Sequence, residues 1–158
     1  MIAAPISFLG PPLRSLRKTQ GYSDTHKAID YVASPGTPAL ATISGKVVGV
    51  TGSGNCGIGL AIQRGTRRVR YCHFSSLAVV EGESVRRGDT VGYTGATGHV
   101  TGPHLHYAMG VRCNGSDCTI VNPEVELAVQ QTVGWALTIG AGLALAASTY
   151  FAGRALLQ

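Results

Sequence analysis

Short runs of β-branched and aromatic residues, separated by glycine and other turn residues, make up most of the chain before about residue 122. This pattern predicts an all-β domain with many turns. Its clearest pair of elements is Ile58–Gln63 and Arg67–Phe74, which a short turn joins as a β-hairpin. In the second of these strands, the alternation of Val69, Tyr71 and His73 predicts that the three side chains share one face.

Four further strands are expected along the chain. They are Thr37–Ile43 and Lys46–Thr51, around a Ser44-Gly45 turn, then Thr90–Tyr93 and His104–Val111. Residues 1–20 are expected to be an irregular lead-in with one short strand near Ile6–Leu9. Leu77–Gly92 is expected to be a loop that leads into the third of the four strands.

The end of the chain has a different pattern. Asn122-Pro123-Glu124 is typical of a helix start, with asparagine as the N-cap and proline in the first helical position. Residues 132–153 contain no charged side chain, and these 22 positions would span about 33 Å as a helix. We therefore expect a C-terminal α-helix over 123–158, with a membrane-spanning segment at 132–153. A buried or partner-binding helix is the alternative. The start of the chain lacks the pattern of a signal peptide.

Composition adds a basic surface to this picture. The 158 residues are enough for one domain and an appendage, and they carry a formal net charge of +5. Basic clusters lie at Arg14–Lys18, Arg64–Arg70 and Arg86–Arg87. Such a surface suits a polyanionic surrounding such as a cell wall or a nucleic acid, and an ordinary basic soluble surface explains it equally well. We expect no specific nucleic-acid partner.

The glycine-rich stretch Gly52–Gly57 formally matches the dinucleotide-binding pattern G-x-G-x-x-G. That pattern requires a helix directly after it. Here Ile58–Gln63 follows, which is a predicted strand. The glycines are therefore expected to serve a bulged loop.

Four cysteines allow three pairings. The predicted hairpin places Cys56 roughly opposite Cys72, and the Asn114-Gly115 turn places Cys113 opposite Cys118. We therefore expect the disulfides Cys56–Cys72 and Cys113–Cys118, which indicate an oxidising location or an extracellular particle. A structural zinc site made of all four cysteines and reduced thiols are the alternatives.

The candidate chemistry lies in the histidines. His104 and His106 are two residues apart, so on a strand both rings face the same space. His26 and Asp30 lie where a turn runs into a strand, and His73 lies in the predicted hairpin. Catalytic zinc takes three ligands from histidine and acidic side chains and keeps one position for water. This leaves two imidazoles for acid–base work.

Five segments that contain these residues occur in the order and at the spacings of a known family. They are His26–Asp30, Pro35–Ala41, Tyr71–Ser75, Gly82–Gly92 and Thr94–Tyr107. In them the chain resembles the lysostaphin-type, or LytM-like, zinc metalloendopeptidases, which cleave peptide cross-links of bacterial cell walls. The resemblance covers roughly residues 20–123. It implies an antiparallel, sandwich-like β-sheet domain over 21–122 with the metal in a groove across the sheet.

The resemblance also implies roles for single residues. It makes His26, Asp30 and His106 the ligands of Zn²⁺, and His73 and His104 the two catalytic histidines. His99 occupies a variable loop position and is expected to be a substrate-groove residue.

The function expected from these features is hydrolysis of peptidoglycan cross-links by a zinc-dependent endopeptidase. The C-terminal helix would anchor it to a membrane, with the catalytic domain in the periplasm or extracellular space, or to a virion membrane as a lytic enzyme. The alternatives are a catalytically inactive wall-binding or activator module of the same fold, and a structural membrane protein. An inactive relative is expected to lack ligands, whereas all five positions are filled here. Neither the bond cleaved nor the oligomeric state follows from the sequence.

Overall fold

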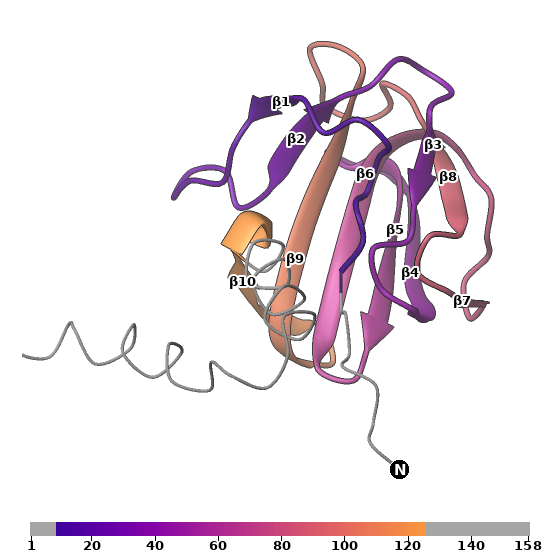
Figure 1. Cartoon of the computed structure of the whole chain (residues 1–158), viewed down its shortest axis with the longest axis vertical. Helices are drawn as coiled ribbons and strands as arrows, with labels where there is room; N and C mark the ends of the chain where they lie inside the picture. Colours follow the sequence, from indigo (N-terminus) through magenta and orange to yellow (C-terminus); the bar gives the residue numbers. More distant parts are fainter. Residues whose placement is uncertain (1–8, 126–158) are drawn as a thin grey trace, which may run out of the picture.

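The computed structural model describes residues 9–125, in which ten strands form one sheet (Figure 1). All of the strand pairings are antiparallel. The expected all-β antiparallel fold is therefore confirmed. The segments 1–8 and 126–158 lie outside the described residues, and with them most of the expected strand near Ile6–Leu9.

The strands follow the chain from β1 to β10. They are β1 (Lys18–Gln20), β2 (Ile29–Val32), β3 (Pro38–Leu40), β4 (Gly45–Ser53), β5 (Gly57–Arg64), β6 (Arg67–Leu77), β7 (Ser84–Val85), β8 (Thr90–Thr94), β9 (His104–Asn114) and β10 (Asp117–Val121). In space their order is β1-β2-β9-β6-β5-β4-β7, with β10 beside β9, and with β8 between β6 and β3. The expected hairpin of β5 and β6 is present.

The two long strands β6 and β9 lie side by side at the centre of the sheet (Figure 1). The other edge of β9 pairs first with β2, along residues 104–107, and then with β10, along residues 109–114. Beyond Cys72, β6 leaves β9 and pairs with β8 from Phe74 onward. The sheet therefore splits after Cys72, where β6 separates from β9.

The hydrophobic core lies on one face of this sheet. Along β9 the side chains of Leu105, Tyr107 and Met109 are buried, while His104 and His106, which alternate with them, are only partly buried. This period of two places the two histidines on the opposite face, as expected for a strand. Segments 9–13 and 39–43 pack on the core side and are joined to each other by backbone hydrogen bonds.

A small polar network crosses the core below β6 and β9. The hydroxyl of the buried Thr42 lies 3.0 Å from the Tyr71 hydroxyl and 2.9 Å from the Tyr107 hydroxyl. The Thr42 amide also donates to the Tyr71 hydroxyl, at 2.8 Å. These contacts satisfy polar groups that would otherwise be buried without partners.

The expected pairing of Thr37–Ile43 with Lys46–Thr51 around a Ser44-Gly45 turn is wrong. Only β3 is a strand in the first segment, and it pairs with β8, whereas β4 pairs with β5 and β7. The segment after Leu40 passes into the core, where the Ala41 amide bonds to Asp89 and the Thr42 amide bonds to Tyr71. Its apolar residues therefore reflect burial under the sheet and not membership of a hairpin.

Three smaller expectations have clear outcomes. The lead-in ends in a strand, β1, which pairs with β2, and the expected loop 77–92 contains β7. The stretch Gly52–Gly57 runs into β5 and not into a helix, which confirms that it is not a dinucleotide-binding turn.

A helix begins at Pro123, as expected, and the Asn122 side chain accepts a 3.0 Å hydrogen bond from the Glu124 amide. Within residues 9–125 there is no helix of sufficient length and hydrophobicity to cross a membrane. The expected membrane-spanning segment 132–153 lies outside the described residues.

Candidate metal centre

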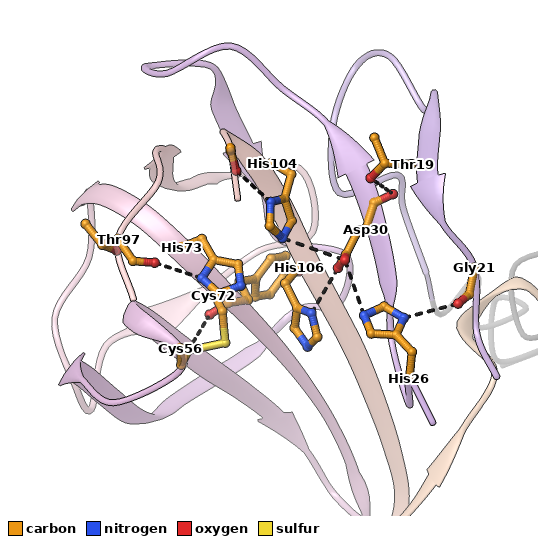
Figure 2. A network of polar contacts seen from close by, with 12 residues as sticks. Thr19, Gly21, His26, Asp30, Cys56, Cys72, His73, Thr97, His104 and His106 are labelled. Atoms are coloured by element: carbon orange, nitrogen blue, oxygen red, sulfur yellow. Dashed lines mark hydrogen bonds and ion pairs between the residues drawn. A yellow bond between two sulfur atoms is a disulfide. The ribbon is translucent and has the colours of Figure 1, made fainter. Parts of the chain in front are cut away.

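The site is built around one cross-strand pair. In the pairing of β2 with β9, Asp30 stands directly opposite His106, so both side chains project from the same face of the sheet. Their side chains meet, with 2.9 Å between Asp30 Oδ1 and His106 Nδ1 (Figure 2).

His26 joins this pair from the turn before β2. The turn is closed by a hydrogen bond from the Ser23 amide to the His26 carbonyl, at 2.8 Å, and by one from the His26 amide to Ser23 Oγ, at 3.1 Å. The His26 ring has Nδ1 at 3.1 Å from the Gly21 carbonyl and Nε2 at 3.3 Å from Asp30 Oδ2. The turn thus aims Nε2 at the carboxylate.

His26, Asp30 and His106 therefore form one cluster of three donor groups, whose ligand atoms lie within 4.8 Å of one another. In a tetrahedral zinc site with bonds of about 2.1 Å, ligand atoms are about 3.4 Å apart. The separations of 2.9 Å between His106 Nδ1 and Asp30 Oδ1 and of 3.3 Å between His26 Nε2 and Asp30 Oδ2 are close to that value. Two imidazoles and one carboxylate are also the donor types that catalytic zinc uses, so the residues present fit this metal.

His104 is the nearest group outside the cluster. It shares the face of β9 with His106, and its Nε2 lies 3.7 Å from Asp30 Oδ2. Its Nδ1 lies 2.9 Å from the Gly102 carbonyl of the preceding loop.

His73 reaches the same space by an irregularity in β6. Its ring centroid is 4.7 Å from that of His104 and 5.6 Å from that of His106. The expected sharing of one face by Val69, Tyr71 and His73 is wrong for His73, because the register of β6 against β5 shifts between Ile58 and Leu60.

The backbone of His73 explains this change of face. Its φ is +69°, a left-handed conformation that is rare for side chains other than glycine, asparagine, aspartate and histidine. Strict alternation would bury the ring with Tyr71, whereas the bulge turns it toward the groove. Gly59 faces this bulge, and a Cβ atom there would lie 2.5 Å from the Tyr71 carbonyl oxygen.

The loop before β9 holds His73 in place through Thr97, which sequence reasoning did not single out. The Thr97 carbonyl lies 2.8 Å from His73 Nδ1 (Figure 2). The Thr97 hydroxyl donates to the Phe74 carbonyl at 2.7 Å and accepts from the Ile58 amide at 2.9 Å. A threonine after glycine and alanine gives no sequence signal for such a brace.

These contacts assign the protons of three rings. A carbonyl oxygen can only accept, so Nδ1 of His26, His73 and His104 must carry the proton in each hydrogen bond. Neutral rings of this kind have their lone pair on Nε2. The backbone therefore leaves Nε2 of all three rings free to bind a metal or to accept a proton.

Electrostatics favour the charged form of Asp30 and the neutral form of His73. Burial raises the pKa of Asp30, but the hydrogen bond from His106 and the nearby imidazoles lower this pKa more, and it lies below its ordinary value. Burial lowers the pKa of His73, and the neighbouring His104 and His106 lower it further, against an opposing effect of the Thr97 carbonyl. His73 is therefore neutral at neutral pH and available as a base.

The expected disulfides are both formed in the structure. Cys56–Cys72 lies beside His73 (Figure 2), and Cys113–Cys118 joins β9 to β10. The site opens into a groove of about 1050 Å³ that the exposed His99 also lines, as expected for a groove residue.

A His–Asp–His cluster that opens into a groove on an all-β sheet has the donor set and the access of a catalytic zinc site. The family model of Peptidase family M23 matches residues 24–123, and the chain belongs to this family. Members of the family are zinc-dependent peptidases, so the expected enzyme class and cofactor are confirmed.

Individual relatives agree with this assignment. The peptidoglycan DD-endopeptidase ShyA of Vibrio cholerae serotype O1 is 41% identical over 88 residues, which are 55% of this chain and 20% of ShyA. The lysostaphin catalytic domain from Staphylococcus simulans aligns with a TM-score of 0.63 at 32% identity, over 72% of this chain and 92% of that domain. A zinc-containing peptidase from Vibrio cholerae aligns with a TM-score of 0.66 at 28% identity, over 72% of this chain and 38% of the other.

The chain spans 18% to 29% of the length of the curated relatives it matches. What those whole proteins do is therefore a proposal for this chain.

Proposed function

We propose that this protein hydrolyses peptide cross-links of bacterial peptidoglycan as a zinc-dependent endopeptidase. In this proposal His26, Asp30 and His106 hold the metal, and His73 and His104 are the catalytic residues. The observation that carries it is the convergence of three donor groups from two strands and a turn within 4.8 Å of one another. The relatives named peptidoglycan endopeptidases support the substrate class.

The chemistry that a zinc ion supplies in such a site is Lewis acidity toward water and toward the scissile carbonyl. His73 and His104 would act as bases, because the proton of each ring is held on Nδ1 by a carbonyl and Nε2 is left to accept. Either ring, once protonated, can pass its proton to the departing amine or stabilise negative charge on the carbonyl oxygen.

The groove suits an extended peptide. It runs across the face of the sheet from Lys27 beside the cluster to Val48 and Val50 on β4. Its walls include the loop residues His99–Thr101. A groove open along its length can take a cross-linked strand of the wall without threading a free end.

The metal role can be tested without turnover. Zinc content of the purified chain should be close to one ion per chain in the wild type and should fall after His106→Ala. His99→Ala removes a histidine from the groove wall and should leave zinc content unchanged. Equal zinc content in the His106→Ala variant would contradict the ligand assignment.

The reaction is tested by digestion of purified peptidoglycan and mass spectrometry of the fragments. New amine termini inside the cross-linking peptides are expected, and they should disappear with a chelator and with His104→Ala. A wild-type chain that binds zinc and peptidoglycan without producing new termini would support the alternative of an inactive wall-binding or activator module.

We also propose that the uncharged segment 132–153 anchors the enzyme to a membrane, either that of a cell or that of a virion in which it serves as a lytic enzyme. The support is the sequence alone, namely 22 positions without a charged side chain. The full chain should sediment with membrane vesicles, whereas a chain that ends at residue 125 should stay in the soluble fraction. Equal recovery of both in the soluble fraction would contradict the anchor.

A further inference from the structure

The groove that contains the metal cluster carries unbalanced positive charge. Asp30 is the one acidic side chain among the described residues that line it, whereas Lys27, Arg68 and Arg70 are basic. Lys27 pairs with Asp24 at 2.9 Å. Because Asp30 faces three imidazoles and would share its charge with a divalent ion, the two arginines have no carboxylate to balance them. The groove therefore favours an anionic ligand.

Arg70 is the guanidinium group nearest to the cluster along β6. It precedes Cys72 by two residues, and Cys72 pairs directly with His106, so Arg70 is displaced from that pair by about 7 Å along the strand. Its neighbours across the strands are Ala61 and Ala108, which are too short to cover it. The residue is exposed, and within residues 9–125 its guanidinium makes no hydrogen bond or ion pair.

Arg68, two residues further along the same face, is held in place by neutral oxygens. Its Nε and Nη2 donate to Gln63 Oε1 at 3.0 and 2.5 Å, and Nη2 also donates to the Gly115 carbonyl at 2.5 Å. These contacts fix the guanidinium without cancelling its charge. Arg68 therefore adds positive potential beside the free guanidinium of Arg70.

Exposed aliphatic side chains line the same groove as the two arginines. Val48, Val50 and Ile120 line the same groove and are 38%, 41% and 41% exposed. A groove that contains both exposed aliphatic side chains and a free guanidinium suits a peptide that offers aliphatic groups and a carboxylate. A glycine bridge offers neither of these groups.

We propose that Arg70, with Arg68 beside it, forms a carboxylate-binding subsite of the groove. The preferred substrate is then a wall peptide with a free carboxylate close to the scissile amide, and not a neutral glycine bridge. A guanidinium binds a carboxylate through two parallel hydrogen bonds, which lysine cannot reproduce. The inference rests on the proposed function, because it names the substrate class of that groove.

The test is a binding measurement that needs no turnover. Two synthetic cross-linked wall peptides are identical except that the residue next to the scissile amide ends in a carboxylate in one and a carboxamide in the other. The scissile amide of both is N-methylated to prevent cleavage. Calorimetry at fixed salt gives Kd for the zinc-loaded wild type, Arg70→Ala and Arg70→Lys. Arg86→Ala is the matched control, because Arg86 is exposed, lies outside the groove and removes the same charge.

The wild type and Arg86→Ala should bind the carboxylate peptide about tenfold or more tightly than the carboxamide. Arg70→Ala should lose most of this preference, with only the contribution of Arg68 left, and Arg70→Lys should keep more of it than Arg70→Ala. Equal binding of both peptides by the wild type, binding of neither, or an unchanged preference in Arg70→Ala would overturn the subsite. Failure to cleave the unmethylated carboxylate peptide, with the preference in binding intact, would count against the proposed function alone.

Discussion

Asp30 sets the charge at the candidate metal centre. It is the one carboxylate of the cluster and faces the rings of His26, His104 and His106. Its low pKa means that the folded chain keeps it ionised at neutral pH, which is the form that binds a metal.

Asp30→Asn should keep the shape of this side chain and remove its charge. Loss of a group that only supports a metal ligand lowers metal affinity by about 10–100-fold. Because Asp30 would itself be a ligand, we expect zinc affinity to fall by more than this. Competition with a chelating dye measures it. Asp24→Asn is the matched control, because Asp24 is exposed and pairs with Lys27 outside the cluster. Similar affinities in the two variants would contradict a ligand role for Asp30.

Thr97 is expected to act on the reaction through His73. Thr97→Val removes the hydroxyl that joins the Phe74 carbonyl to the Ile58 amide and so loosens the carbonyl that holds His73 Nδ1. If the less well positioned ring raises the activation free energy by about 1–2 kcal/mol, kcat falls about tenfold.

Thr97→Ser keeps the hydroxyl and should restore kcat, while zinc content stays the same in both variants. Steady-state kinetics with a cross-linked wall peptide measures the effect. If Thr97→Val lowers the melting temperature but not kcat, the Thr97 hydroxyl contributes to stability alone and the prediction is wrong.

The side chains of the site could be predicted from sequence, whereas the backbone carbonyls that orient the histidine rings could not. The spacing of His104 and His106 fixes their common face on any strand, and the order of motifs brings in His26, Asp30 and His73. The carbonyls that fix the rings belong to Gly21, Thr97 and Gly102. Every residue has a carbonyl, so no residue type marks the ones that are used.

At the scale of elements, the alternation rule holds for β9 and fails in β6. Leu105 and Tyr107 face the core and His104 and His106 face the groove, as the period of two predicts. In β6 the bulge at His73 changes the face after Tyr71. A bulge depends on the partner strand, which a single segment of sequence does not define.

The hydroxyl network below β6 and β9 gives a prediction for alkaline pH. In the folded chain, burial raises the pKa values of Tyr71 and Tyr107 above the ordinary value of a tyrosine. The folded state then holds protons that the unfolded chain releases near pH 10, so stability is full below about pH 10 and falls as pH rises above it.

Tyr107→Phe removes one of these protons and one hydrogen bond to Thr42. It should destabilise the chain by about 1 kcal/mol near pH 8, and the gap from wild type should narrow near pH 11. Urea unfolding at the two pH values measures both effects. A gap of equal size at both would mean that Tyr107 ionises as easily in the folded chain as in the unfolded one.

For the whole molecule, the cluster links parts of the chain that are distant in sequence. Asp30 and His26 belong to β2 and the turn before it, whereas His106 belongs to β9, 76 residues after Asp30. An ion bound to all three binds the folded chain and not the unfolded one, and so it should stabilise the fold.

Zinc at about 100 times its dissociation constant should add about 2.7 kcal/mol, or about 5–15 °C in the melting temperature. Calorimetric scans with zinc and with a chelator measure the shift. His106→Ala should lose most of it. A shift of equal size in that variant would place the stabilising ion elsewhere.

Diffraction at the zinc absorption edge, from crystals of the zinc-loaded chain, can locate the ion that we assign to His26, Asp30 and His106. We predict one strong anomalous peak at about 2.0–2.2 Å from His26 Nε2, an Asp30 carboxylate oxygen and His106 Nδ1. A peak at other side chains, or none at these three in crystals that contain zinc, would contradict it.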